Sequence, residues 1–336
     1  MPIPNTFGLP ATADQYIEAH SVDELRDLLD RDRQHISHHC LVVGAGSNMV
    51  FTRHYPGTVI HMANKGIQLL HCDEEHVLCQ AAAGEVWDDF VHHCIAQGWY
   101  GAENLVAIPG TVGAAPVQNV GAYGIEAKDI IHSVHTVEIG TGNERIFSNE
   151  ECRFGYRDSI FKHELAGRYI VCSVVFRLNT RFAPNLSYKA LANLSSSANL
   201  TAKALTDAIT ELRWSKLPRP EETGSAGSFF KNPVVPASQY EALRAQYPDI
   251  VAYPVAAPAG EEPSATSWKL AAGWLIEHAG WKGRSLGRAG VYEKQALVLV
   301  NRGGCTGEEV QTLADTIVAD IQNKFGVTLT PEAIIV

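Results

Sequence analysis

Apolar residues recur along the chain at two different spacings, which predict a mixture of helices and short strands. A capping box begins at Ser21, and the apolar residues behind it (Val22, Leu25, Leu28 and Leu29) recur at helical spacing. Further helices are predicted at residues 85–96, 201–213, 238–246, 269–278 and 306–325. Short β-rich runs predict strands at residues 40–43, 58–61, 77–81, 170–178 and 296–300.

Two segments interrupt this pattern. Residues 104–125 follow neither spacing and are expected to form a long structured loop. Residues 215–232 are rich in Pro, Gly and Ser, which is typical of a domain boundary. We therefore expect an α+β protein with a larger first part that ends near residue 214 and a smaller α+β second part.

Composition and charge restrict the classes of partner. The 336 residues are 46% hydrophobic and 19% charged, which is typical of a globular protein of about two domains. The formal net charge of −10 argues against a general nucleic-acid or acidic-membrane binder, because phosphate surfaces are held mainly by surplus cations. A small anionic ligand held by a few local cations remains compatible with this charge.

The chain shows no sign of a membrane span or a secretory signal. Residues 104–125 are uncharged and long enough for a span, but Pro109, Pro116 and four glycines argue against a lipid-facing helix. The N-terminus lacks a basic region followed by an apolar run. Seven irregularly spaced cysteines without a CxxC pair are expected to be reduced, buried thiols of a cytoplasmic protein.

The first segment of chemical interest is the glycine turn at residues 44–48, which follows a predicted strand. Glycines let a backbone approach an anion closely. Met49 stands where the dinucleotide-binding pattern needs a third glycine, so that fingerprint fails. A plain strand–turn junction is an equal alternative.

The most unusual segment is residues 108–124, which has four glycines, small neighbours and no charge. Gln118 and Asn119 could hydrogen-bond a polar ring, and Tyr123 offers a flat face or a hydroxyl. Long loops of this kind are usually functional, although packing inside its own domain is an alternative.

Three polar residues stand out elsewhere. Arg157, between Tyr156 and Asp158, suits a carboxylate or phosphate site, although a surface ion pair with Asp158 or Glu151 is an equal alternative. Ser228 lies in a glycine-containing turn and could present its hydroxyl, or the turn could be purely structural. Glu332 has apolar neighbours on both sides and is expected to be packed inside, where a paired structural role is the alternative.

The His-His-Cys runs at residues 38–40 and 92–94 are not expected to bind a metal. Adjacent side chains point in different directions, and no closing pair stands at a zinc spacing. We expect these residues to be surface or packing residues.

Taken in order, the motifs resemble one family over nearly the whole chain, from Asn5 to Glu332. They read NTFG, GAGSN, IPGTVGAAPVQNVGAYG, CRFGYRDSIFK, KLPRP, GSAGSFFKNP, KLAAGWLIE, QALVLVN and a terminal Pro-Glu. This combination resembles the UDP-N-acetylenolpyruvoylglucosamine reductases, also called UDP-N-acetylmuramate dehydrogenases, of the longer type I class.

The resemblance implies a fold and an activity. It implies the FAD-binding fold of the vanillyl-alcohol oxidases (the PCMH type), with a C-terminal α+β substrate domain. FAD would be bound non-covalently and reduced by NADPH, and would reduce a UDP-linked enolpyruvyl sugar to UDP-N-acetylmuramate in the cytoplasm. The implied division is an FAD-binding region at 1–183, an extension at 184–214, a substrate domain at 215–325 and a terminal segment at 326–336.

The resemblance also implies roles for individual residues. Arg157 and Glu332, the latter protonated, would stabilise the enolate-like charge, and Ser228 would protonate the carbon. The implied FAD residues are Gly44, Gly46, Ser47, Asn48, Pro109, Gly110, Gly113, Ala114, Ala115, Gln118, Asn119, Gly121, Ala122, Tyr123, Gly124 and Arg213, the last near the phosphates. The implied UDP-sugar residues are Tyr156, Tyr188, Lys216, Asn232, Lys269 and Gln295. Tyr188 matches the aromatic residue that closes over the diphosphate.

Three departures from the family pattern are visible. Ile334 stands where the long class often has Arg, Ala114 and Ala115 stand where Ser can occur, and the Pro-rich stretch at 254–263 is longer than usual. Two alternatives share the fold: a sugar or lactone oxidase, which the lack of His or Cys in the glycine loops argues against, and a non-catalytic flavin or UDP-sugar binder. We expect no metal, no nucleic-acid or membrane partner, and a monomer.

Overall fold

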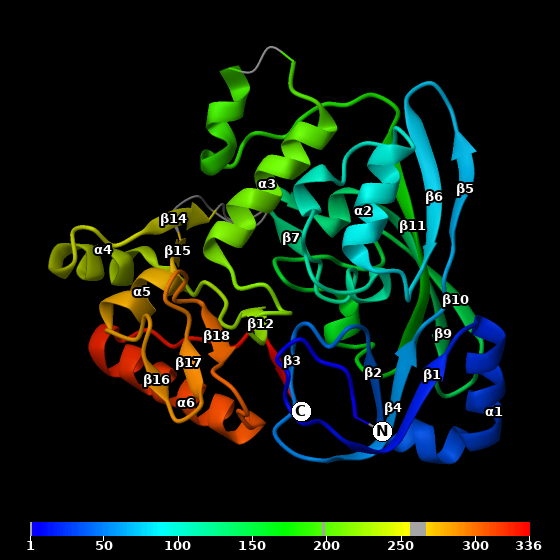
Figure 1. The fold of residues 1–336 in the computed structure, drawn as a ribbon, viewed down its shortest axis with the longest axis horizontal. Coiled ribbons are helices and arrows are strands. Elements are labelled where there is room, and N and C mark those ends of the chain that lie inside the picture. The colour runs from blue at the N-terminus through cyan, green and yellow to red at the C-terminus, as the bar shows by residue number, and fades with distance from the viewer. Residues whose placement is uncertain (1, 197–198, 256–266) are drawn as a thin grey trace. The chain divides into compact units, whose positions relative to one another are not determined.

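The structure is a computed structural model that describes residues 2–196, 199–255 and 267–336. Figure 1 shows the fold, whose strands pair across long stretches of sequence within each of two compact units. The first unit consists of Met1–Ile3, Thr12–Gly46 and His54–Trp214, and the second of Pro4–Ala11, Ser47–Arg53 and Ser215–Val336. Two short N-terminal segments thus belong to the second unit. The division predicted from the sequence assigned both of them to the first region.

A small parallel sheet begins the first unit. Its order is β1-β4-β2, formed by Ala13–Ala19, Tyr55–Met62 and Cys40–Val43. Helix α1 (Val22–His38) begins at Ser21, whose side chain accepts a hydrogen bond from the Glu24 N–H at 3.0 Å. Leu25, Leu28 and Leu29 of this helix are buried. The predicted helical face is therefore confirmed.

A five-stranded antiparallel sheet forms the larger part of the first unit. Its order is β10-β9-β11-β6-β5, formed by Glu144–Ser148, Ile131–Glu138, Tyr169–Asn179, His76–Ala82 and Ile67–Cys72. Helix α2 (Trp87–Ala96) packs on this sheet (Figure 1). The ring centres of Phe90 on α2 and Phe176 on β11 lie 4.5 Å apart. These residues belong to one continuous apolar core.

Short elements connect this sheet to the segments of chemical interest. The 3-10 turns are η1 (Glu103–Leu105), η2 (Val112–Ala114), η3 (Ala127–Asp129), η4 (Ile160–Lys162) and η5 (Lys189–Ser196). Strands β7 (Gly121–Ala122) and β8 (Ile125–Glu126) form a small hairpin, and helix α3 (Ala202–Lys216) ends near the change of unit. Residues 104–125 thus form a structured loop with only short regular pieces, as predicted.

Two antiparallel sheets and one short parallel pair build the second unit. Their orders are β12-β18-β17-β16 (Ser225–Ser228, Val298–Asn301, Ala289–Val291, Ser285–Leu286), β13-β15-β14 (Val234–Pro236, Ser267–Leu270, Ala252–Val255) and β19-β3 (Ile334–Ile335, Met49–Val50). The helices are α4 (Ala237–Gln246), α5 (Ala272–His278) and α6 (Gly307–Phe325). Helix α6 begins at a complete capping box of Thr306 and Glu309, and one apolar face of it is buried, formed by Val310, Leu313, Ile317, Ile321 and Phe325.

Three expectations need correction. The helix predicted at 269–278 is two elements, because Lys269 lies on β15 and the helix begins only at Ala272. Of the seven cysteines expected to be buried, Cys72 is exposed, because it ends the edge strand β5, and Cys40 is half-buried. Of the Pro-rich stretch at 254–263, residues 254 and 255 end strand β14, and the rest lies outside the described residues.

Candidate active site

Left-handed backbone is concentrated in the segments singled out from the sequence. Among the described residues other than glycine, those with positive φ are Ala107 (58°), Asn119 (47°), Tyr123 (49°), Arg153 (46°) and Arg157 (55°). This conformation costs L-residues about 1–2 kcal/mol each. Such strain persists only where the surroundings enforce it, and it gathers at functional sites.

A clamp of two charged side chains holds Ala107, which begins the long loop. Its N–H donates to Oδ1 of Asp88 at 2.5 Å, and its carbonyl accepts from Nε of Arg213 at 2.8 Å. Arg213 also hydrogen-bonds the Tyr123 side chain; burial lowers the pKa of Arg213, and the neighbouring Tyr123 opposes this shift. Burial likewise raises the pKa of Tyr123, against the effect of Arg213. The clamp therefore fixes a desolvated cation beside the loop.

Asn119 is fully buried and holds the middle of the loop. Its Nδ2 donates to Oε2 of Glu126 at 3.0 Å and to the carbonyl of Gly155 at 2.9 Å, and its Oδ1 accepts from the Lys128 N–H at 2.9 Å. Both side-chain N–H groups are thus used inside the protein. The direct hydrogen bond to a polar ring that the sequence suggested for them is replaced by a role in shaping the loop.

Arg157 is joined to the same loop. Its Nη2 donates to the carbonyl of Gly121 at 2.7 Å, and its guanidinium carbon lies 5.3 Å from the centre of the Tyr156 ring. The two acids of the surface-pair alternative contact other side chains: Asp158 lies 2.8 Å from His163, and Glu151 lies 3.5 Å from Arg145. The structure therefore brings together Arg157, Tyr156, Gly121, Tyr123 and Arg213.

The glycines of the two loops serve different purposes. Gly44 packs against the side chain of Thr111, and a Cβ added to Gly113 would lie 2.6 Å from Cβ of Ala83. Gly46, Gly110 and Gly124 have φ values of +62°, +141° and +87°. Thus some glycines allow close packing of the two loops, and others make their turns.

The donor set of these loops fits FAD. Pro109 and Gly124 are exposed, and Gly46, Ala115 and Asn119 are buried. The half-exposed positions carry no charge; they are Gly44, Gly110, Gly113, Ala114, Gln118, Gly121, Ala122 and Tyr123. Small uncharged residues let backbone N–H groups approach a diphosphate or a flat ring, and the Arg213 guanidinium complements phosphate charge. Tyr188 is 46% exposed, and its ring packs edge-on against Tyr123 with centroids 5.2 Å apart.

In the second unit, a bulge presents Ser228. Strand β12 pairs with β18 at Ser225 and Ser228, and the register shifts between them, where Gly227 has φ +68°. Phe229 and Phe230 are buried behind the bulge, whereas Ser228 is exposed. β-Bulges re-aim side chains beside active sites, and this one directs the hydroxyl to solvent.

The main chain of Glu332 is hydrogen-bonded to Phe229, the residue that follows Ser228. Its N–H donates to the carbonyl of Phe229 at 2.7 Å, and its own carbonyl accepts from Nδ2 of Asn48 at 3.2 Å. Asn48 is therefore beside Glu332 in the second unit, and Ser47 belongs to the same segment. Glu332 is half-buried, so the expectation that it is packed inside is too strong; the short strand β19 that follows it pairs with the two-residue β3.

Three of the predicted substrate residues gather at the start of α5. Oδ1 of Asn232 accepts from the N–H of Ala272 at 2.9 Å, and Oε1 of Gln295 would lie 3.2 Å from a Cβ on Gly273. Lys269 lies on β15, directly before this helix. Lys216 is instead the exposed last residue of α3.

The NTFG motif braces the strand that carries Ser228, a role that sequence reasoning missed. Thr6 exchanges two hydrogen bonds with Ser225: Oγ1 donates to its carbonyl at 2.7 Å, and the Ser225 N–H donates to the Thr6 carbonyl at 3.1 Å. Gly224 leaves no room for a Cβ against the Phe7 carbonyl. The motif could be recognised in the sequence, but its partner Ser225 lies 219 residues further along the chain.

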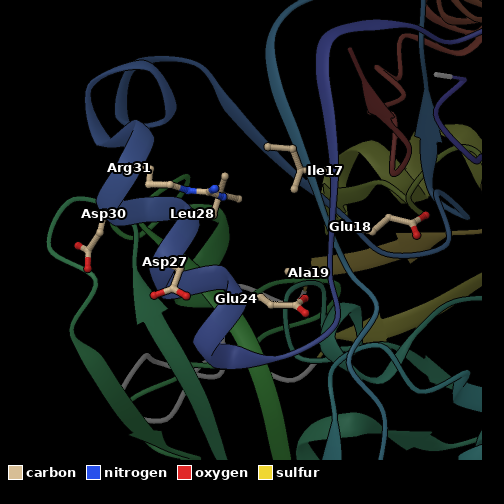
Figure 2. Close-up of a pocket in the computed structure, with 8 residues that line it drawn as sticks. All are labelled: Ile17, Glu18, Ala19, Glu24, Asp27, Leu28, Asp30 and Arg31. Atoms are coloured by element: carbon tan, nitrogen blue, oxygen red, sulfur yellow. The ribbon is translucent and has the colours of Figure 1, made fainter.

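A separate hollow in the first unit does not contain the predicted residues. This cavity of about 530 Å³ is lined by Ile17, Glu18, Ala19, Glu24, Asp27, Leu28, Asp30 and Arg31. Figure 2 shows the carboxyl groups of Glu24, Asp27 and Asp30 along α1, with Arg31 as the one cation of this lining. Its negative charge is unsuited to a diphosphate.

Within the described ranges, no cluster of three or more His, Cys, Asp and Glu could hold a metal ion. His92 is exposed and lies 3.9 Å from Asp88, and the ring of His93 packs edge-on against Trp99. No helix in the part of the chain that the structure describes is long and apolar enough to cross a membrane.

Comparison with known proteins identifies relatives of both parts. A family model for the C-terminal domain of UDP-N-acetylenolpyruvoylglucosamine reductase matches residues 219–336, and one for an FAD-binding domain matches residues 13–148. A protein of Neisseria gonorrhoeae named UDP-N-acetylenolpyruvoylglucosamine reductase is 47% identical over 98% of this chain and 93% of its own. One of the same name from Burkholderia vietnamiensis is 46% identical over the same shares. The crystal structure of this reductase from Thermus caldophilus shares the fold (TM-score 0.63, 23% identity, 98% of this chain and 95% of that one).

Proposed function

Because the chain belongs to the UDP-N-acetylenolpyruvoylglucosamine reductase family, we propose that Arg157, Ser228 and Glu332 perform the reduction of the enolpyruvyl group. The enzyme is an FAD- and NADPH-dependent oxidoreductase that makes UDP-N-acetylmuramate for peptidoglycan synthesis. The assignment of residues rests above all on the hydrogen bond from the Glu332 N–H to the Phe229 carbonyl at 2.7 Å. That bond joins the main chain of Glu332 to the residue that follows the exposed Ser228.

Arg157 is proposed to stabilise the charge that develops on the substrate. When bound, FAD would supply a hydride obtained from NADPH. Addition of this hydride to the terminal enol carbon would leave negative charge toward the substrate carboxylate. A guanidinium remains charged and binds carboxylate with a planar fork. The bond from Nη2 to the Gly121 carbonyl orients the group in advance. Preorganised donors of this kind contribute about 10²–10³-fold in rate.

Ser228 and Glu332 are proposed to complete the reaction. Glu332, in its protonated form, donates a second hydrogen bond to the enolate-like charge. Ser228 then gives a proton to the carbon that bears the ether oxygen. A hydroxyl is a weak acid, but a positioned general acid contributes about 10²–10⁴-fold.

The remaining predicted residues are proposed to bind cofactor and substrate. The half-exposed loops at 44–48 and 109–124, with Arg213, would hold FAD, with Asn119 shaping the loop from within. Tyr156, Tyr188, Lys216, Asn232, Lys269 and Gln295 would hold the UDP-sugar. We also propose that the enzyme acts as a monomer in the cytoplasm, where its nucleotide-sugar product is used. Size-exclusion chromatography and cell fractionation would check these two points.

A flavin absorption experiment tests the residue roles. NADPH is added without oxygen to the parent enzyme and to Ser228→Ala and Glu332→Gln, followed by the UDP-enolpyruvyl sugar. In all three proteins NADPH should bleach the flavin band at similar rates. Recovery of the band with the sugar should be at least 100-fold slower in the two variants.

Two outcomes would contradict the assignment. Recovery at the parent rate in both variants would remove Ser228 and Glu332 from the mechanism. A parent flavin that is reoxidised by oxygen but ignores the sugar would favour an oxidase instead.

A further inference from the structure

Asn104 joins two segments that carry proposed site residues. Its side chain is 2% exposed. Its Nδ2 donates to the carbonyl of Tyr123 at 2.8 Å and to the carbonyl of Asn185 at 2.9 Å. One buried amide thus connects the cofactor loop to the segment that leads into Tyr188, with its two partners 19 and 81 residues further along the chain.

The Tyr123 turn is a conformation that needs an external hold. Tyr123 has φ +49° and Gly124 φ +87°, so two successive residues are left-handed. A hydrogen bond to the carbonyl of the strained residue limits its rotation toward ordinary backbone conformations. Asn104 therefore stabilises the turn at its most strained residue.

The segment at 185–188 fits closely against the same turn. Oδ1 of Asn185 accepts from the Ser187 N–H at 3.0 Å and from the Ser187 hydroxyl at 2.7 Å. A Cβ on Gly124 would lie 2.6 Å from Oγ of Ser187. The 46% exposed ring of Tyr188 then meets the ring of Tyr123. Tyr188 is thus positioned by main-chain geometry more than by burial of its own ring.

We propose that Asn104 is a positioning residue for substrate binding, which holds Tyr188 over the cofactor loop through its two hydrogen bonds. This inference rests on the proposed role of Tyr188 toward the diphosphate of the UDP-sugar. Asn104 does not act on the substrate itself. Loss of the Asn104 side chain should weaken binding of the UDP-sugar and leave the reaction with NADPH unchanged.

The test compares Asn104→Ala with a matched control in the same unit. Asn149 makes the same pair of contacts, since its Nδ2 donates to the carbonyls of Lys128 and Ile131 at 2.8 and 2.7 Å, but it joins no proposed site residues. Because a net hydrogen bond contributes about 1 kcal/mol, KM for the UDP-sugar should rise about tenfold or more in Asn104→Ala, with kcat within about twofold. Asn149→Ala should leave this KM at the parent value.

A readout independent of turnover accompanies the kinetics. Amide hydrogen exchange, followed by mass spectrometry on the holoenzyme, should accelerate about tenfold at residues 121–124 and 185–191 in Asn104→Ala and remain at the parent rate there in Asn149→Ala. Asn104→Leu has a similar volume and no donors, so it gives the same test if the alanine variant does not fold.

A third variant separates this proposal from the function on which it rests. Tyr188→Ala should raise the same KM, and Asn104→Ala should then add little to it, since both changes act through Tyr188. If Tyr188→Ala leaves KM unchanged, the proposed role of Tyr188 is wrong. If Tyr188→Ala raises KM while Asn104→Ala and Asn104→Leu do not, or raise it no more than Asn149→Ala, the role of Asn104 is wrong.

Discussion

The loop at 107–124 and the strand at 224–228 both present site residues, but they hold their backbones by different means. The loop uses left-handed residues other than glycine, fixed by side chains such as those of Asp88, Arg213 and Asn119. The strand uses Gly224 and Gly227, close packing and main-chain hydrogen bonds. In the first region, conformation depends on donors and acceptors far away in sequence; in the second, it depends on the lack of a side chain.

This difference teaches how each region fails. A left-handed residue carries a cost that the folded protein offsets, so removing the residue's Cβ should relieve strain. A glycine in close contact carries no such cost, so adding a Cβ should create one. Ala→Gly at a left-handed position of the loop should therefore stabilise the protein, whereas the same change destabilises an ordinary helix. Gly→Ala at a close contact of the strand should destabilise the protein, whereas the same change is tolerated in an open loop.

The largest expected effect is at Gly224→Ala. The new methyl group would collide with the carbonyl of Phe7, which belongs to the brace behind Ser228, and would lie 3.3 Å from Cβ of Asn301. We expect a loss of about 3 kcal/mol in the free energy of unfolding, measured by urea denaturation. Gly140→Ala, where nothing lies within 4 Å of the added Cβ, should change stability by less than about 0.5 kcal/mol. Equal effects at both positions would show that the brace is not tightly packed.

A smaller and opposite effect is expected at Ala107→Gly. The clamp by Asp88 and Arg213 uses only the backbone of this residue and survives the change. Relief of about 1–2 kcal/mol of left-handed strain exceeds the extra entropy of glycine, so the protein should gain about 0.5–1 kcal/mol. The control is Ala208→Gly in the right-handed helix α3, which should lose about 1 kcal/mol in the same denaturation assay. A loss of the same size at residue 107 would show that its conformation is not strained.

The smallest effect is expected at Glu103→Gln, and it should depend on pH. Oε2 of Glu103 accepts from the Gly101 N–H at 2.8 Å, whereas Oε1 is buried with no hydrogen-bond partner among the described residues. Burial raises the pKa of this carboxyl. A raised native pKa gives stability that is present below the unfolded value, about 4.3, and is lost as pH rises through the native value.

Urea midpoints between pH 4 and pH 8 check this expectation. The parent should lose stability relative to Glu103→Gln as pH rises, and the difference should be smallest at acid pH. A difference that is constant across this range would mean that Glu103 titrates alike in the folded and unfolded chains. Such a result would also show that Glu103, directly before the strained loop, is not a buried charge.

Local patterns predicted the regular parts of the fold well. The capping boxes at Ser21 and Thr306 mark the starts of α1 and α6, and the apolar face of α6 is buried. The antiparallel strands β5, β9 and β10 could not be predicted, because polar residues interrupt their apolar pattern. Their stability comes from pairing: β5 pairs with β6, β9 with β11, and β10 with β9. The helix expected at 269–278 failed for a related reason, since Lys269 pairs with both β13 and β14.

The candidate site divides in the same way. Motifs located Arg157, Ser228 and Glu332, because unusual residue types stand out in a sequence, and their chemical roles stay predictions. Motifs did not reveal that the Asn119 amide is used internally, or that Thr6 and Asn104 support the site. An ordinary Asn or Thr gains its meaning from the carbonyl it meets, and that partner is set only by the tertiary fold.

The pairing of β3 with β19 also affects when the second unit can form during synthesis. The Thr52 N–H and hydroxyl both donate to the Val336 carbonyl at 2.8 Å, and the partners of Asn48 and Thr52 lie 284 residues further along the chain. Contacts of such long range form late, because the whole intervening chain must first be made. Residues 47–53 therefore leave the ribosome early and stay without these hydrogen-bond partners until residues 332–336 have emerged. On a growing chain, the surroundings of Glu332 are among the last parts of the protein to assemble.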